Sequence, residues 1–285
     1  MRCIGDYEIG ETIGEGAFSK VKVGVHRVTG RRVALKFINT NMMEQTVGYL
    51  QFRREIEIHS RLRHRNIAQL IQVIEDEDRG RTCLVVEFIQ GRDLLDVISD
   101  SQKGGLSESE ASVYFSQIVA AVQYLHGNGI AHRDIKLENV MVTDTGVCKI
   151  IDFGFSRGTK DNDIMKTPCG SPVYVSPEIM KKKTYCGMQS DVWSLGVLLY
   201  SLVSGCVPWA GLDIIRKRER AERGDYIPLQ DASPSLQNLI MGCLCVEPED
   251  RMTIMDVQSH EWTMRRHLKR RVSGPFRSMV RKIMR

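Results

Sequence analysis

The pattern of apolar residues changes about a third of the way along the chain, and this change limits the folds open to it. Before it, apolar and polar residues alternate between glycines, which is typical of strands. Strands are predicted over 7–13, 21–26, 32–38, 67–74 and 82–88. One segment, 46–62, instead has apolar residues near helical spacing among many charges, which predicts an amphipathic helix.

From Asp93 onward the pattern is mainly helical. Helices are predicted over 108–126, 190–204, 213–223, 233–243 and 254–259. The sequence therefore predicts an α+β fold with two lobes. The first is a small five-stranded antiparallel β lobe with one helix, and the second is larger and mainly helical.

The composition is that of an ordinary soluble globular protein, with 42% apolar and 26% charged residues, so a large core can be buried. No apolar run reaches the roughly 18 residues of a transmembrane segment. The N-terminus has neither a signal-peptide pattern nor a glycine at position 2. The eight cysteines match no paired zinc-binding spacing, so buried thiols in a reducing compartment are expected. We expect a cytoplasmic protein and leave nuclear entry open.

A glycine-rich segment joins the first two predicted strands. Its residues are Ile13, Gly14, Glu15, Gly16, Ala17, Phe18, Ser19, Lys20 and Val21. Glycines let a backbone approach phosphate groups closely. A strand follows instead of a helix, which disfavours a dinucleotide site with its pyrophosphate on a helix N-terminus. Taken alone, the segment is also compatible with an ordinary hairpin.

Lys36 stands inside the next apolar strand, where an unpaired ammonium group would be costly. Glu55, on the predicted helix that follows, is the candidate partner. Each charge alone is compatible with a solvated surface residue. Together, after a glycine-rich loop, they indicate an ion pair that holds phosphates.

The segment 132–139 is the strongest chemical signal, because polar and charged side chains crowd together directly after an apolar helix. Asp152-Phe153-Gly154 follows it at the end of an apolar strand. An isolated tripeptide of this kind is a common turn. Both motifs, in this order and at this separation, are hard to obtain by chance.

These motifs together closely resemble the eukaryotic protein kinases, over about residues 7–262. The segments 136–139, 170–172 and 191–197 are most similar to the calmodulin-dependent and AMP-activated kinase group. The resemblance implies a two-lobed kinase fold, ATP and Mg²⁺ as cofactors, and transfer of the γ-phosphoryl group to proteins. Lys136, two residues after Asp134, is typical of serine/threonine kinases, so Ser and Thr hydroxyls are the expected acceptors.

The resemblance also implies which residues surround the nucleotide. These are Ile13, Gly14, Glu15, Gly16, Ala17, Phe18, Ser19, Val21, Ala34, Lys36, Glu55, Glu87, Ile89, Asp93 and Met141. Lys36 would bind the α- and β-phosphates and pair with Glu55. Asp134 would accept or orient the proton of the substrate hydroxyl, and Lys136 would stabilise the transferred group. Asn139 and Asp152 would hold Mg²⁺.

Regulation by phosphorylation is a further implication. Thr167 aligns with the activating phosphothreonine of the family, and Arg133 would pair with its phosphate. The alternative is an unmodified loop threonine. Pro168 departs from the usual residue here and leaves the upstream activating kinase open.

Substrate contacts follow from the same resemblance. Asp93 and Glu138 occupy positions that receive an arginine three residues before the target. Ser171 would hydrogen-bond near Asp134 and Lys136 and shape the pocket for the next residue. Three architectural residues are also implied: Glu178 and Arg251 as a buried ion pair, and Asp191 as a brace for the catalytic loop.

His59 is a departure from the family pattern, because many relatives carry an aliphatic residue at this position. That residue belongs to a stack with Leu70, His132 and Phe153 that links the helix to the loop. We expect a histidine to weaken this stack or to make it sensitive to pH.

A basic tail follows the catalytic domain. We expect an N-terminal extension over 1–6, the kinase domain over 7–262 with lobes at 7–88 and 89–262, and a tail over 263–285. The tail holds nine of the 40 Lys and Arg residues and no acid. Beyond Pro275 its apolar residues recur at helical spacing. A solvated tail, a docking or autoinhibitory helix, a calmodulin target and an acidic-lipid contact all remain open.

Two other functions are alternatives to a protein kinase. A pseudokinase acting as a scaffold would be indicated by loss of Lys36, Asp134, Asn139 or Asp152, and none is lost. A small-molecule kinase is disfavoured by the segment 167–178, which resembles a peptide-positioning loop. Protein substrates are therefore the expected partners, with no nucleic acid.

Overall fold

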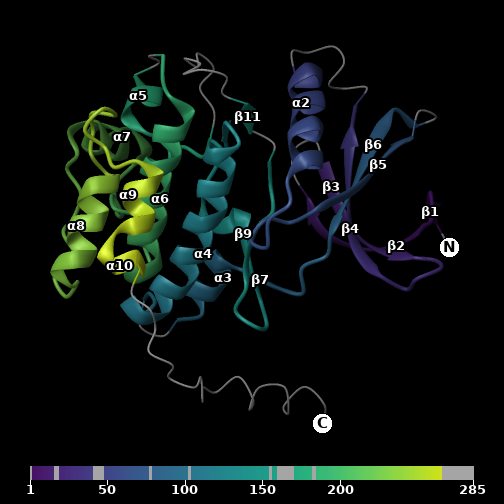
Figure 1. Cartoon of the computed structure of the whole chain (residues 1–285), viewed down its shortest axis with the longest axis horizontal. Coiled ribbons are helices and arrows are strands. Elements are labelled where there is room, and N and C mark those ends of the chain that lie inside the picture. The colour runs from purple at the N-terminus through teal and green to yellow at the C-terminus, as the bar shows by residue number, and fades with distance from the viewer. Residues whose placement is uncertain are drawn as a thin grey trace, which may run out of the picture.

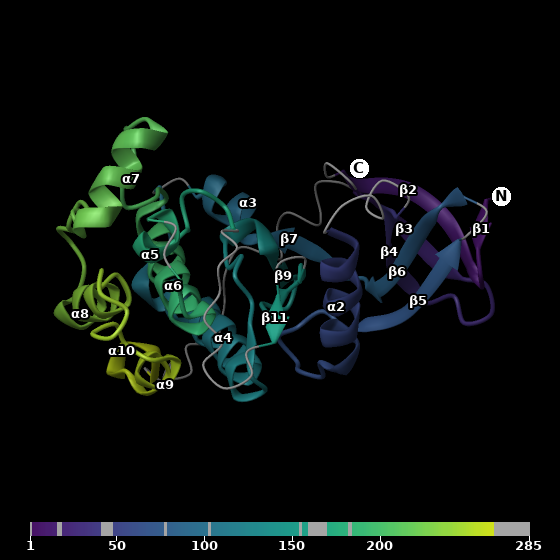
Figure 2. The same cartoon turned by 90° about the horizontal axis from the view of Figure 1, so that it is seen from above.

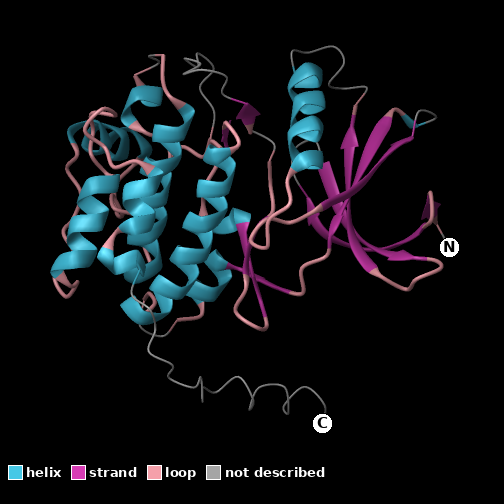
Figure 3. Ribbon diagram, viewed as in Figure 1, coloured by secondary structure: helices cyan, strands magenta, loops and turns pink. Residues whose placement is uncertain are grey.

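The computed structural model describes residues 2–15, 19–40, 48–76, 79–101, 104–153, 156–158, 170–181 and 184–264. Two lobes lie side by side, one built around a β sheet and the other mainly helical (Figures 1 and 3). The expected α+β, two-lobed fold is confirmed. None of the helices in the described ranges combines the length and apolar character needed to cross a bilayer.

The sheet lobe is antiparallel throughout. In spatial order its strands are β1 (Cys3–Ile4), β2 (Tyr7–Glu15), β3 (Ser19–His26), β4 (Arg32–Asn39), β6 (Arg81–Glu87) and β5 (Leu70–Asp76). The short β1 adds a sixth strand to the five expected, because residues ahead of Tyr7 fold back on the sheet. β5 begins later than predicted, and Ile67 instead forms a parallel bridge with Ile150 of the other lobe.

Helix α2 (Gly48–Arg61) lies between the sheet and the helical lobe (Figure 2). Phe52 anchors it in a small core with Ile38, Leu70 and Leu84 from the strands. The helix therefore belongs to the sheet lobe by packing, but its position allows its side chains to reach the other lobe.

The helical lobe has one large core around α6, which is buried along most of its length. Its helices are α3 (Leu94–Ser99), α4 (Glu108–Gly127), α5 (Pro177–Met180), α6 (Gly187–Ser204), α7 (Ile214–Arg223), α8 (Pro234–Cys243), α9 (Ile254–Ser259) and α10 (Glu261–Met264). A capping box of Ser107 and Glu110 begins α4, and a left-handed Gly205 ends α6. The helices predicted for this lobe are confirmed, with small shifts at their ends.

Short elements on the side of this lobe nearest the sheet carry the motifs of the sequence (Figure 1). They are β7 (Gly91–Asp93), β8 (Ile130–Ala131), the 3₁₀ helix η2 (Leu137–Asn139), β9 (Val140–Thr143), β10 (Cys148–Ile150) and β11 (Arg157–Gly158). β9 lies between β10 and β7, while β11 pairs with β8. The loop between β8 and η2 and the residues after β10 are therefore held by hydrogen-bonded strands.

Candidate active site

A cavity of about 720 Å³ lies between the lobes, within the size range of small-molecule sites. Most of the residues predicted to surround a nucleotide line this cavity, and Glu55 is the one described exception. The predicted residues that line it are Ile13, Gly14, Glu15, Ser19, Val21, Ala34, Lys36, Glu87, Ile89, Asp93 and Met141. Gly16, Ala17 and Phe18 lie outside the described residues. The fold thus gathers residues from β2 to β9 around one space.

Lys36 contacts Asp152 inside this cavity, with Nζ and Oδ1 2.9 Å apart. Burial lowers the pKa of Lys36, but the charges of Asp152 and Glu55 and the hydrogen bond to Asp152 outweigh it. The pKa therefore lies above its ordinary value, and the lysine stays charged. A cation and an anion from different lobes meet where a nucleotide would lie.

The expected ion pair between Lys36 and Glu55 is wrong for this conformation: the described residues contain no such contact. The Lys36 ammonium group contacts Asp152 instead, whose side chain is 42% exposed, whereas Glu55 is buried. Burial, opposed by the charge of Lys36 and supported by that of Asp152, raises the pKa of Glu55 to about 7. Near neutral pH the Glu55 carboxyl group therefore holds a proton more readily than a solvated glutamate does.

The catalytic-loop residues surround the carboxylate of Asp134. Its Oδ2 lies 2.9 Å from Lys136 Nζ and accepts a hydrogen bond of 2.9 Å from Asn139 Nδ2. Its Oδ1 accepts two hydrogen bonds of 3.0 Å from Ser171, one from the backbone and one from the hydroxyl. Lys136 also donates to the Ser171 hydroxyl at 2.8 Å. The predicted residues of the loop and of the downstream segment therefore meet around one carboxylate.

Gly170 explains how that downstream segment comes so close. Its φ is +101°, and a Cβ atom here would lie 2.8 Å from the carbonyl oxygen of Arg133. Any other residue would push Ser171 away from Asp134.

The backbone of the loop is strained at Arg133, whose φ is +68°. Asp191 on α6 holds this conformation by accepting the backbone N–H groups of His132 at 2.8 Å and Arg133 at 2.7 Å. His126 contacts the same carboxylate at 2.9 Å. The bracing role expected of Asp191 is confirmed, as is the buried pair of Glu178 with Arg251 at 2.9 Å.

The side chains of Asn139 and Asp152 provide oxygen atoms that could serve as ligands for a cation. The side-chain amide nitrogen of Asn139 donates hydrogen bonds to Asp134, so its side-chain oxygen can serve as a metal ligand. The backbone oxygen of Asn139 accepts a hydrogen bond from the N–H of Ile151, next to Asp152. Asp152 keeps 42% of its side chain exposed. Mg²⁺ prefers such hard oxygen ligands and retains several waters, so a carboxylate and an amide oxygen beside nucleotide phosphates fit it.

A sheet lobe, a helical lobe and a nucleotide-sized cavity between them, with this lysine and these aspartates, define the two-lobed kinase fold. Comparison with known sequences agrees with that class. The chain belongs to the protein kinase family, because the family model described as "Protein kinase domain" matches residues 7–263.

Curated relatives fall in the group expected from the sequence. They include "NUAK family SNF1-like kinase 1" of Mus musculus, 40% identical over 90% of the chain. The "Carbon catabolite-derepressing protein kinase" of Candida tropicalis is 40% identical over 91%. "Probable serine/threonine-protein kinase MARK-B" of Dictyostelium discoideum is 39% identical over 91%. The chain spans 38%, 41% and 36% of the lengths of these three proteins.

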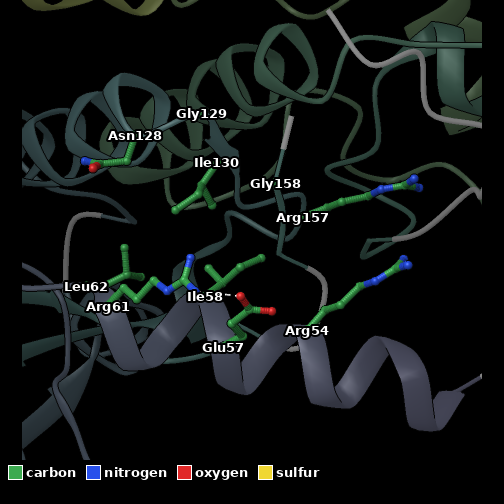
Figure 4. Close-up of a pocket in the computed structure, with 10 residues that line it drawn as sticks. All are labelled: Arg54, Glu57, Ile58, Arg61, Leu62, Asn128, Gly129, Ile130, Arg157 and Gly158. Carbon is green, nitrogen blue, oxygen red and sulfur yellow. Dashed lines mark hydrogen bonds and ion pairs between the residues drawn. The ribbon is translucent and has the colours of Figure 1, made fainter. Parts of the chain in front are cut away.

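A second cavity, of about 690 Å³, lies between α2 and the helical lobe (Figure 4). Arg54 from α2 and Arg157 from β11 point their guanidinium groups to the same side of it. Neither forms an ion pair with another described residue, whereas Arg61 is paired with Glu57 at 2.7 Å. Arg54 and Arg157 are far apart in the sequence, so no local pattern connects them. The pairing of β11 with β8 brings Arg157 beside the catalytic loop.

Proposed function

We propose that this chain transfers the γ-phosphoryl group of ATP to Ser and Thr hydroxyls of proteins. The observation that carries the proposal is the meeting of Lys36 and Asp152 in the cavity, next to the ring of donors around Asp134. Protein kinase family membership and the names of the relatives support it.

Each residue has a task in this proposal. Lys36 binds the α- and β-phosphates, and Asn139 and Asp152 hold Mg²⁺, which neutralises charge on the phosphate oxygens when bound. Asp134, oriented by Asn139 and Ser171, accepts a hydrogen bond from the substrate hydroxyl group and takes up its proton during transfer. Lys136 lies 2.9 Å from Asp134 and stabilises the phosphoryl group during transfer.

The direct test is phosphorylation of a library of peptides by the purified chain with Mg²⁺ and ATP. Peptides with Ser or Thr should be phosphorylated, and Asp134→Asn should lose at least about a hundredfold in kcat, since it removes the acceptor for the proton. An inactive wild type, or an Asp134→Asn variant with full activity, would contradict the proposal.

A preference for arginine three residues before the target is the second part of the proposal. Glu138 is exposed at the rim of the cavity and has no hydrogen bond or ion pair with another described residue, so its charge is available. Asp93 lines the same cavity, although one of its oxygens caps α3 through the N–H of Asp96. Glu138→Gln should reduce the enrichment of arginine at this position in the library, while a library without any enrichment would exclude the preference.

Activation by phosphorylation of Thr167, which lies outside the described residues, is the third part. Arg54 and Arg157 support it, because neither forms an ion pair within the described residues and together with Arg133 they supply three guanidinium groups for a phosphate. Thr167→Ala should lower kcat at least about tenfold after treatment with an activating kinase. Arg54→Gln and Arg157→Gln should blunt the same activation, and full activity of Thr167→Ala would argue for an unmodified threonine.

A further inference from the structure

His59 is a buried polar side chain on α2, one turn after Glu55. Its Nε2 atom lies 2.7 Å from the carbonyl oxygen of Ala68, which can only accept a hydrogen bond. Nε2 must therefore carry a proton and donate it. Burial lowers the pKa of His59 to about 4, so the ring is neutral near pH 7 and its other nitrogen carries no proton.

The acceptor is tied to the helical lobe. The N–H of Ala68 donates to the carbonyl oxygen of Ile150 at 2.8 Å, and Ala68 also lines the nucleotide cavity. Ile150 ends β10, two residues before Asp152. A line of hydrogen bonds therefore runs from helix α2, through Ala68, to the end of β10, two residues before Asp152.

The His59 ring also packs against the residue after Asp152. Its centroid lies 4.5 Å from that of Phe153, with the planes tilted by 31°. Phe153 in turn meets His132 nearly edge-on at 5.1 Å. An aliphatic residue at position 59 could supply such contact, whereas the imidazole adds a bond with a fixed direction.

This bond matters more here because, among the described side chains of α2, no other buried polar group has a hydrogen bond or ion pair that ties the helix to the cavity. Lys36 contacts Asp152, and Glu55 forms no ion pair with a described residue. The contact of Arg53 with Glu75 on β5 leaves both side chains more than half exposed, at 55% and 53%. Exposed pairs of this kind contribute little to stability.

We propose that His59 is a positioning residue for phosphoryl transfer, which fixes α2 to the cavity wall through its hydrogen bond to Ala68 and aligns Phe153 and Asp152 by ring contact. The inference rests on the proposed kinase activity. It reverses the expectation that a histidine weakens this stack, because the bond adds a constraint that packing alone lacks.

The test compares His59→Leu, which keeps apolar volume but removes the donor, with His59→Gln, which keeps a donor but removes the ring. Peptide phosphorylation is measured at saturating ATP, together with the KM for ATP and the melting temperature. His59→Leu should lower kcat about fivefold, the factor expected for one lost hydrogen bond. His59→Gln should recover part of the loss, and Ser60→Ala, exposed on the same helix, should behave as wild type.

A measurement independent of activity is the ¹⁵N–¹H spectrum of histidine side chains. Wild type should show a slowly exchanging Nε2–H signal that His59→Leu lacks. An active wild type with an equally active His59→Leu variant, or a missing signal, overturns the inference. An inactive wild type overturns the proposed function instead.

Discussion

Two buried titratable side chains on α2 respond to pH in opposite senses. The pKa of Glu55 is raised from 4.5 to about 7 by burial, so the folded state binds a proton that the unfolded state releases in this interval. That stability is lost as the pH rises from 4.5 to 7. The pKa of His59 is lowered from 6.5 to about 4, so stability is lost as the pH falls from 6.5 to 4.

The two effects, each about 3 kcal/mol across its full interval, should nearly cancel between pH 4.5 and 6.5. In Glu55→Gln the free energy of unfolding should therefore rise more steeply with pH than in wild type. In His59→Leu it should rise less steeply or fall. Urea unfolding at several pH values measures both slopes, and equal slopes in all three proteins would refute the assigned protonation states.

Lys36 is expected to be needed for activity and dispensable for folding. Lys36→Met removes the cation beside Asp152 and the proposed phosphate contact, so kcat/KM should fall at least about a hundredfold. Lys217→Met on α7, remote from the cavity, is the matched control and should keep full activity. Retained activity in Lys36→Met would remove the lysine from the mechanism.

Between β8 and η2, the catalytic loop depends on a helix that is distant in sequence. Asp191 is fully buried and accepts the N–H groups of His132 and Arg133. Asp191→Ala leaves these donors unpaired around a strained residue, so we expect a loss of about 3 kcal/mol and reduced activity.

The control for this variant is Asp256→Ala, which removes the capping carboxylate of α9 on the surface. It should cost about 1 kcal/mol and leave activity intact. If Asp191→Ala costs no more than the control in thermal unfolding, the brace is not needed to hold the loop.

The two lobes are linked by a charge pair beside the cavity. Lys149 on β10 lies 2.9 Å from Glu87 at the end of β6, with 15% and 26% of the side chains exposed. Glu87 also accepts the backbone N–H of Gln69 at 3.2 Å. The pair therefore restrains the angle between the lobes at the wall of the nucleotide cavity.

Lys149→Met should raise the KM for ATP about two- to fivefold, because the cavity wall is then held less firmly. The double exchange Lys149→Glu with Glu87→Lys should recover part of the loss. Arg53→Met breaks a pair within the sheet lobe and serves as control. An unchanged KM in Lys149→Met would show that the pair does not set the geometry of the cavity.

Much of the fold could be read from local patterns. Alternation predicted the strands from β2 to β6, and helical spacing with stop signals predicted α2, α4 and α6 to α9. The motifs around Asp134 and Asp152 predicted the cleft. These predictions succeeded because hydrophobic periodicity and turn chemistry depend on residues that are neighbours in the chain. β1 was missed, since two residues carry no period.

Partners chosen across space could not be read in the same way. The order of motifs along the chain predicted Glu55 as the partner of Lys36, but the lysine contacts Asp152. His59 was expected in an apolar stack, and in the structure it also forms a hydrogen bond with a backbone carbonyl group. Arg54 and Arg157 share a cavity although nothing in their local sequence connects them. Local residues determined the elements and the chemistry available, whereas packing of the two lobes selected which charges meet, because distance and burial arise only on folding.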